Sequence, residues 1–134
     1  MANEWTKVEL YGQNNDGDPR RYTCASGTAI SKGTLLVLSD PRTVAAHASI
    51  GQYMGGVAAM DKSATDGSTS ISAWTNGIFE GKSSGTMTIG LPFKTSNLPN
   101  HVEPAANTII GSAVGGYALE TGSGVETINL RLRL

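Results

Sequence analysis

Hydrophobic and polar residues alternate in short runs along this chain, and glycines or polar turns separate the runs. The clearest alternation is in residues 128–134, which place four apolar residues on one face and an asparagine, Arg131 and Arg133 on the other. This period of two is typical of a half-buried antiparallel strand. Residues 2–10 alternate in the same way, and the apolar run 34–38 predicts a buried strand.

Further short strands are expected in the middle of the chain, at residues 53–60, 71–75, 86–89 and 109–119. The Asn76-Gly77 pair directly after residues 71–75 predicts a tight hairpin turn, with the return strand beginning at Ile78.

Four segments do not show a strand pattern. Residues 44–50 follow a proline and are rich in alanine, which favours a turn or two of helix. The stretch 12–19 is polar and rich in turn residues, and residues 81–85 also predict a turn. Residues 91–104 hold three prolines and little periodicity, so we expect a long surface excursion there. Taken together, the pattern predicts a mainly β protein of about eight to ten short strands, a sandwich or barrel, with at most one or two short helices.

Composition narrows the fold further. The 134 residues are enough for one domain, and 17 of them are glycines. Each glycine inside a helix costs roughly 1 kcal/mol, so a helical bundle is disfavoured. Hydrophobic residues make up 39% of the chain, enough for a modest core, and the net charge of −1 argues against disorder. The balanced charge offers no basic surface for a nucleic acid or an anionic membrane, so neither is an expected partner.

Residues that carry chemistry are sparse. Cys24 is the only cysteine, which excludes an internal disulfide, and we expect it in the core of a protein that folds in a reducing setting. His47 and His101 lie far apart, and we interpret both as surface or loop residues rather than as zinc ligands or catalytic bases. We therefore expect no metal and no cofactor.

Motif spellings do not change this picture. The sequence Gly81-Lys-Ser-Ser-Gly85 spells a nucleophile elbow around Ser83, but the residues after it are β-like where that motif needs a helix. The glycine that a phosphate-binding P-loop needs is replaced by Asn76. Residues 14–18 have the composition of a calcium loop, but Pro19 and Ala25 occupy the positions of its glycine and its glutamate. No catalytic residue is identified, and we expect the protein not to be an enzyme.

One family resemblance rests on the middle of the chain. Residues 27–38, then Gly55-Gly-Val-Ala-Ala-Met-Asp61, then Ile71-Ser-Ala-Trp-Thr-Asn-Gly-Ile-Phe79 follow one another at short intervals. This order resembles the head-decoration proteins of tailed bacteriophages, of the lambda D-protein type. Residues 109–134 resemble the end of that family more loosely.

The resemblance implies a β-tulip fold, and trimers of the chain bound to the major capsid protein on the outside of the virion head. Such a protein is made in the host cytoplasm and stabilises the expanded capsid against the pressure of the packaged DNA. Residues 1–20 would form an N-terminal capsid-binding arm, and residues 21–134 a single β decoration domain. The arm's expected capsid contacts are Glu4, Trp5, Thr6, Val8 and Leu10.

Two questions stay open on the sequence alone. Arg131 and Arg133 are either solvated or part of a salt-bridge seam at the trimer interface or facing the capsid. The chain as a whole is either a capsid decoration protein or another virion β module, such as a tail or head-fibre component or a carbohydrate-binding adhesin domain.

Overall fold

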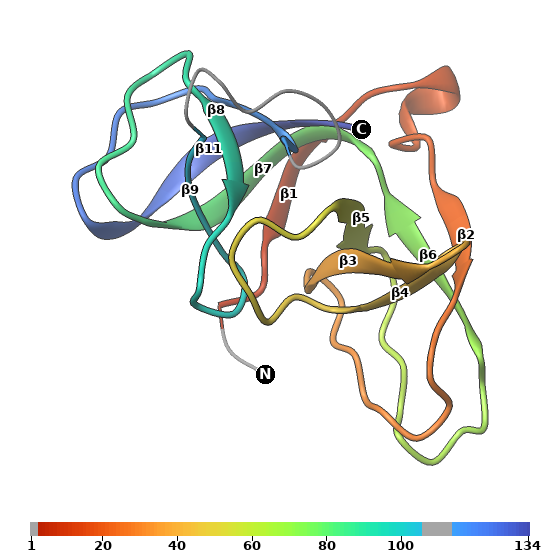
Figure 1. The fold of residues 1–134 in the computed structure, drawn as a ribbon. Coiled ribbons are helices and arrows are strands. Elements are labelled where there is room, and N and C mark those ends of the chain that lie inside the picture. Colours follow the sequence, from red (N-terminus) through yellow and green to blue (C-terminus); the bar gives the residue numbers. More distant parts are fainter. Residues whose placement is uncertain (1–2, 106–113) are drawn as a thin grey trace.

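Short strands account for nearly all the regular structure in a computed structural model of the chain, which describes residues 3–105 and 114–134 (Figure 1). These residues contain eleven strands and one 3-10 turn, Gln13–Asn15. The strands are β1 Thr6–Leu10, β2 Arg20–Thr23, β3 Leu35–Asp40, β4 Thr43–Ala46, β5 Met54–Ala58, β6 Ser70–Trp74, β7 Asn76–Ser84, β8 Pro92–Thr95, β9 His101–Pro104, β10 Gly116–Ala118 and β11 Val125–Arg133.

The first of two barrels, here called the N-terminal barrel, is a closed sheet in the order β2-β4-β3-β5-β6. Its closure is weakest between β2 and β4, which pair in parallel through Thr23 and Thr43 alone. Its core consists of small and branched side chains. The buried members are Cys24, Ile30, Leu36, Val44, Ala58, Ile71 and Ala73.

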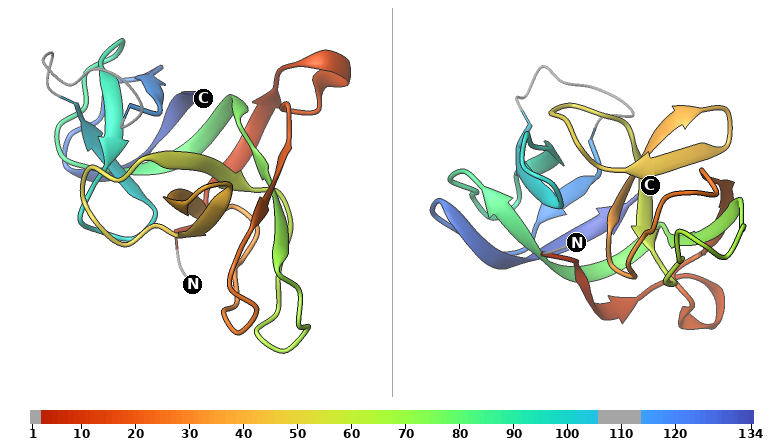
Figure 2. Two further views of the ribbon diagram at one scale, coloured as in Figure 1. Left: turned by 45° about the vertical axis from the view of Figure 1, so that its right-hand side comes forward. Right: turned by 90° about the horizontal axis from the view of Figure 1, so that it is seen from below.

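Two long loops extend from the N-terminal barrel and lie side by side (Figure 2). Lys62 joins them: its side chain is buried, and its Nζ donates to the carbonyls of Ser26 at 2.9 Å and Thr28 at 3.0 Å. Asp66 lies 3.8 Å from the same ammonium group. These contacts satisfy a buried charge that would otherwise be costly, and they fix the two loops to each other.

The second barrel, the C-terminal barrel, consists of β7, β11, β10, β8 and β9, and a short β7–β9 pairing closes it. Strand β1 adds to β7 as an edge strand. Its core is richer in large side chains and is continuous with residues from the first barrel. The buried members are Trp5, Leu35, Met54, Val57, Trp74, Phe79, Met87, Phe93, Val102, Ala118, Ile128, Leu130 and Leu132.

The predicted mainly β, barrel-like fold is confirmed, with eleven described strands where about eight to ten were expected. Alternation found the terminal strand correctly: Ile128, Leu130 and Leu132 are buried, while Arg131 and Arg133 are not. The strands expected at 34–38, 53–60 and 71–75 are also present, and Cys24 is buried as predicted. Of the strand expected at 109–119, residues 109–113 lie outside the described part of the chain.

The hairpin predicted at Asn76-Gly77 is wrong. Strand β6 pairs with β2 and β5, whereas β7 pairs with β1, β11 and β9, so the chain passes from one barrel to the other at Thr75. Gly77 serves a different purpose there. A Cβ at this position would lie 2.6 Å from the carbonyl oxygen of Glu9, so glycine allows β1 to approach β7.

Four other local predictions are wrong. Residues 43–46 form β4 instead of a helix, and residues 81–84 continue β7 instead of turning. Within 86–89 only Met87 makes a β-bridge. The proline-containing stretch 91–104 supplies β8 and β9, which bury Phe93 and Val102. Its prolines fall at the first residue of β8, in the loop and at the last residue of β9, where a missing N–H costs the sheet little.

Candidate functional site

The residues proposed as capsid contacts occupy different environments. Thr6 and Val8 are exposed on β1, Val8 by 53%, while Glu4 and Leu10 are half-buried. Trp5 is buried in the core. Contact of these five residues with a capsid stays a prediction, and in this structure Thr6 and Val8 are the members most available for it.

Trp5 connects the two barrels. Its backbone N–H donates to the carbonyl of Gly33 at 2.8 Å, and its indole Nε1 donates to the carbonyl of Asn100 at 3.0 Å. The ring lies 6.1 Å from Phe79 and 6.0 Å from Phe93, between centroids. Sequence alternation did not reveal this role, because it groups Trp5 with Lys7 and Glu9, which are exposed.

Arg131 and Arg133 point to different neighbours although both lie on β11. The Arg131 guanidinium stacks over the Tyr11 ring at 4.5 Å and donates to the carbonyls of Gly77 and Leu132. It is therefore used within the chain, holding the segment after β1 against β11. Arg133 makes no such side-chain contact among the described residues and faces a groove between the barrels.

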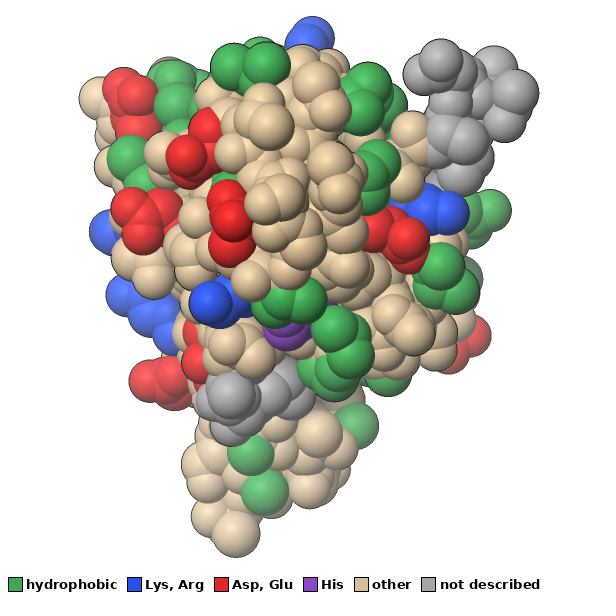
Figure 3. Space-filling view, turned by 90° about the vertical axis from the view of Figure 1, so that its left-hand side faces the viewer, with side chains coloured by type: hydrophobic (Ala, Val, Ile, Leu, Met, Phe, Trp, Pro, Cys, Tyr) green, Lys and Arg blue, Asp and Glu red, His purple; other side chains and the backbone are tan. Residues whose placement is uncertain are grey.

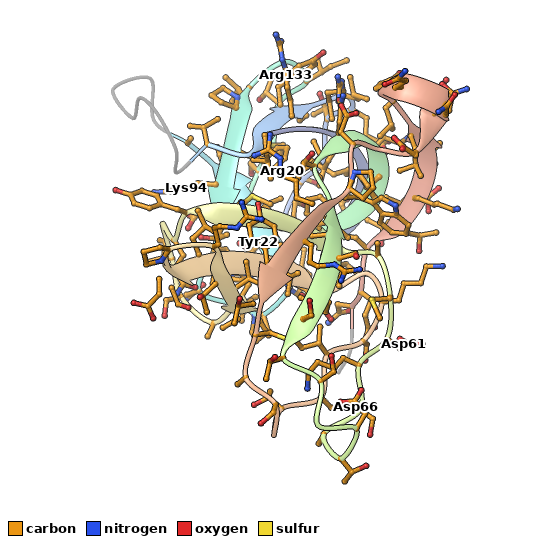
Figure 4. The ribbon with its side chains drawn as sticks, turned by 90° about the vertical axis from the view of Figure 1, so that its right-hand side faces the viewer. Arg20, Tyr22, Asp61, Asp66, Lys94 and Arg133 are labelled. Carbon is orange, nitrogen blue, oxygen red and sulfur yellow. The ribbon has the colours of Figure 1, made fainter. Side chains whose placement is uncertain are left out.

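This interbarrel groove has a volume of about 340 Å³ and lies where the mouth of the N-terminal barrel meets the end of β11. Figure 4 shows Arg133, Arg20 and Tyr22 along this junction. Arg20 and Arg133 are exposed, and Tyr22 is held by a 3.0 Å hydrogen bond from its hydroxyl to the carbonyl of Gly55. Among the described residues, the lining consists of Arg20, Tyr22, Leu38, Met54, Gly55, Val114, Arg133 and Leu134.

Of the groove residues, sequence reasoning singled out Arg133 but missed Arg20, Tyr22 and Leu38. These residues lie far from Arg133 along the chain, and no motif relates them to it. Arg20 and Arg133 line the same groove because of the way the two barrels are joined, and no local sequence pattern specifies that.

Several buried polar groups lie at the barrel junction, around His47. Asn100 donates its backbone N–H to His47 Nδ1 at 3.1 Å, so the proton of the neutral ring is on Nε2, which donates to the carbonyl of Ser96 at 2.7 Å. His47 is 2% exposed and His101 is 6% exposed, so the prediction of surface positions is wrong for both. His47 does lie in a loop, directly after β4, whereas His101 is the first residue of β9. Both help to attach the β8–β9 loop: His101 Nδ1 also contacts the carbonyl of Pro99.

Comparisons with known proteins found similarity in fold alone. Neither a scan against protein-family models nor a search of curated proteins found a match. Among solved structures, the chain is similar to the crystal structure of the head fiber gp8.5 N base in bacteriophage phi29.

The fold is similar to that of the phi29 head-fibre base.

The similarity to the phi29 base has a TM-score of 0.53 at 17% sequence identity, and it covers 85% of this chain and 92% of the base. A match of this extent reaches into both barrels. At this identity the likeness concerns the fold, and the missing family match leaves the decoration-protein resemblance as a proposal.

The described residues offer little that suggests catalysis. Ser83 is fully buried within β7, and its Oγ donates to the carbonyl of Gly124 at 3.0 Å, so its hydroxyl serves the backbone. Across residues 3–105 and 114–134, no three His, Cys, Asp or Glu side chains gather as a metal site would need. No helix in that part of the chain is long and apolar enough to span a bilayer.

The surface has no dominant apolar patch on the face that Figure 3 presents, where hydrophobic side chains form separate groups among Asp and Glu side chains. A large obligate hydrophobic interface is therefore not evident on that face. The interbarrel groove, in contrast, combines two arginines with apolar side chains in one hollow.

The His47 environment predicts that stability falls in mild acid. Burial lowers the pKa of His47, and the nearby His101 adds to this, against the raising effect of hydrogen bonds to Ser96 and Ser49. Because the unfolded ring has a pKa of about 6.5, the unfolded state binds the proton first. The stabilisation is thus complete above about pH 6.5 and is lost as the pH falls from there towards the folded-state pKa, by at most about 1.4 kcal/mol per pH unit.

Urea unfolding at several pH values between 7.5 and 5 measures this loss. His47→Gln keeps a hydrogen-bonding side chain that does not titrate, so its stability should depend less steeply on pH than that of the wild type. Equal slopes for the two proteins would show that His47 does not cause the acid sensitivity.

Proposed function

We propose that the chain is a non-enzymatic structural protein of a bacteriophage virion, located on the outer surface of the head. The observation that carries this proposal is the fold similarity to the phi29 head-fibre base, which extends over 85% of the chain. A protein that works by covering a surface needs geometry and contact area, and it can do without a cofactor or a reactive group.

The head-fibre base supports a more specific role as a seat on the major capsid protein. In that role the two barrels form a rigid block, joined by Trp5 and the His47–Asn100 contacts. Exposed residues of β1 and the interbarrel groove are then available to a partner. We further propose that three copies assemble at one site, as the resemblance to the head-decoration proteins implies, in a closed symmetric assembly.

A cement role is the second candidate, and the resemblance of residues 27–79 to the head-decoration proteins favours it. A decoration protein holds neighbouring capsid subunits together through many repeated, individually modest contacts. A fibre base needs only to be attached. The two roles therefore differ in what removal of the protein does to the head.

The direct test uses heads from the virus that encodes the chain, assembled without it. Purified chain is added, unbound protein is removed by sedimentation, and the heads are imaged by electron cryomicroscopy. We expect density at regular positions on the outer surface. Absence of binding, or binding confined to tails, would contradict the proposal. Thermal release of DNA then separates the two roles: a cement protein raises the release temperature, whereas a fibre base leaves it unchanged.

A further inference from the structure

The interbarrel groove combines two arginines with an apolar floor. Arg20 comes from β2 of the N-terminal barrel and Arg133 from β11 of the C-terminal barrel, and Leu38 and Met54 line the same groove. Leu38 is 40% exposed, an unusual position for a leucine in a strand that is otherwise buried at its start. The groove thus presents positive charge beside an accessible apolar surface.

No acidic side chain of the described residues pairs with either arginine. None of the side chains that line the groove is acidic, and in residues 3–105 and 114–134 neither arginine forms an ion pair. The remaining residues, 1–2 and 106–113, contain no Asp or Glu. Asp61 and Asp66 lie in the protruding loop, away from Arg20 and Arg133 in Figure 4.

Guanidinium groups recognise carboxylates well, because their planar N–H groups match the two oxygens of a carboxylate. Two of them at one groove therefore favour an occupant with one or more carboxylates. The volume of about 340 Å³ is at the lower end of that of ligand pockets, so it admits a few side chains rather than a folded domain.

The strand beside the groove favours a polypeptide as that occupant. Arg20, Arg21 and Tyr22 of β2 pair with β6 on one side, but β4 meets β2 only at Thr23. Among the described residues, the backbone of residues 20–22 therefore has no strand partner on its second side. An extended chain can hydrogen-bond to such an edge.

We propose that the interbarrel groove binds an extended acidic segment of the head protein on which this chain sits, with its carboxylates on Arg20 and Arg133 and a neighbouring apolar side chain on Leu38. The identity of the partner rests on the proposed function, whereas the preference for an acidic segment follows from the groove itself.

Charge-reversal variants of this chain test the proposal, and their affinity for heads is measured. Arg20→Glu and Arg133→Glu should each weaken binding about tenfold or more, and the double variant should bind at least about a hundredfold more weakly. Arg21→Glu is the matched control, because it makes the same charge change one residue away on the opposite face of β2. The Arg20→Lys, Arg133→Lys variant should retain part of the affinity. If the control loses as much as the double variant, or the double variant binds like the wild type, the proposal is wrong.

A second measurement requires no heads. Nuclear magnetic resonance titration with acetyl-hexaglutamate amide should shift signals of Tyr22, Leu38 and Met54 in the wild type but not in the double charge-reversal variant, and acetyl-hexaglutamine amide should shift neither. Absence of these shifts in the wild type would overturn the proposed groove chemistry. Shifts with a wild type that does not bind heads would instead overturn the proposed function and leave the groove assignment standing.

The identity of the occupant on heads is read by photo-crosslinking from benzoylphenylalanine at position 38, with position 89 as the control, since Ile89 is 61% exposed outside the groove. We expect a crosslink to the capsid protein from position 38 alone. A crosslink from position 38 to a second copy of the chain would overturn the assignment and make the groove a self-association surface.

Discussion

Trp5→Ala is expected to lower the free energy of unfolding by about 3–5 kcal/mol, the usual cost of removing a large buried aromatic side chain. The substitution leaves a cavity next to Phe79 and Phe93 and removes the indole hydrogen bond to the carbonyl of Asn100. Gly81 increases the loss. The ring packs directly on the backbone of Gly81, because a Cβ there would lie 2.5 Å from Trp5. Gly81 therefore has no side chain that could move into the cavity.

Urea unfolding followed by far-ultraviolet circular dichroism measures the effect, because the variant lacks one of the fluorescent tryptophans. Thr6→Ala is the control: it changes the next residue, which is exposed, and should shift stability by no more than about 0.5 kcal/mol. A loss below about 1 kcal/mol for Trp5→Ala would mean that the ring does not join the barrels as described.

The same contacts bear on residues 1–20, which the sequence suggested as an arm separate from the β domain. That boundary stays a prediction. Strand β1 nevertheless pairs with β7, and Trp5 is in the core, so removal of residues 2–18 takes away a strand and a core residue together with any capsid contacts. Loss of head binding by such a truncation is informative only if its stability is measured as well.

Asn100→Ala is expected to cost about 2–4 kcal/mol for two separate reasons. The buried Oδ1 of Asn100 accepts the backbone N–H of Leu35 at 2.9 Å, and leaving that donor unpaired costs about 1–3 kcal/mol. Asn100 also has a φ of 63°, in the left-handed region that asparagine tolerates better than alanine, by roughly 1 kcal/mol.

Two further variants separate these contributions. Asn100→Gly relieves the backbone strain but still lacks the acceptor, so it should retain most of the loss. Asn14→Ala is a matched control, because Asn14 has a φ of 62° and is exposed, and should show the backbone effect alone. If Asn100→Ala and Asn14→Ala destabilise the protein equally in thermal unfolding, the bond to Leu35 contributes nothing measurable.

The sequence was most informative where one face of a strand is buried and the other is wet. Residues 128–133 show this plainly, since alternation there reflects the side-chain period of a strand directly. It failed where tertiary contacts override local signals. The prolines of residues 91–104 and the alanines of 44–50 indicated non-strand structure. Pairing within the two barrels nevertheless places part of each stretch in a sheet, as β8 and β9 and as β4.

The candidate site followed the same rule. Arg131 and Arg133 were indistinguishable as alternating basic residues of one strand, and only the fold separates them. The Tyr11 ring, in the segment after β1, stacks against the Arg131 guanidinium, whereas Arg133 lines the interbarrel groove together with Arg20. Burial of His47 and His101 was equally hidden, because their partners are backbone groups that carry no sequence signature.

The strand order also bears on how the chain folds as it leaves the ribosome. All five strands of the N-terminal barrel lie between Arg20 and Trp74. In the other sheet, β7 must pair with β1 near the start of the chain and with β11 at its end. Pairing over such long separations is slow, and the N-terminal part of a nascent chain is released first. The N-terminal barrel can therefore close before Phe79 and Phe93 have left the ribosome and packed against Trp5. During that interval the indole is exposed to water, and the nascent chain is at its most vulnerable to aggregation.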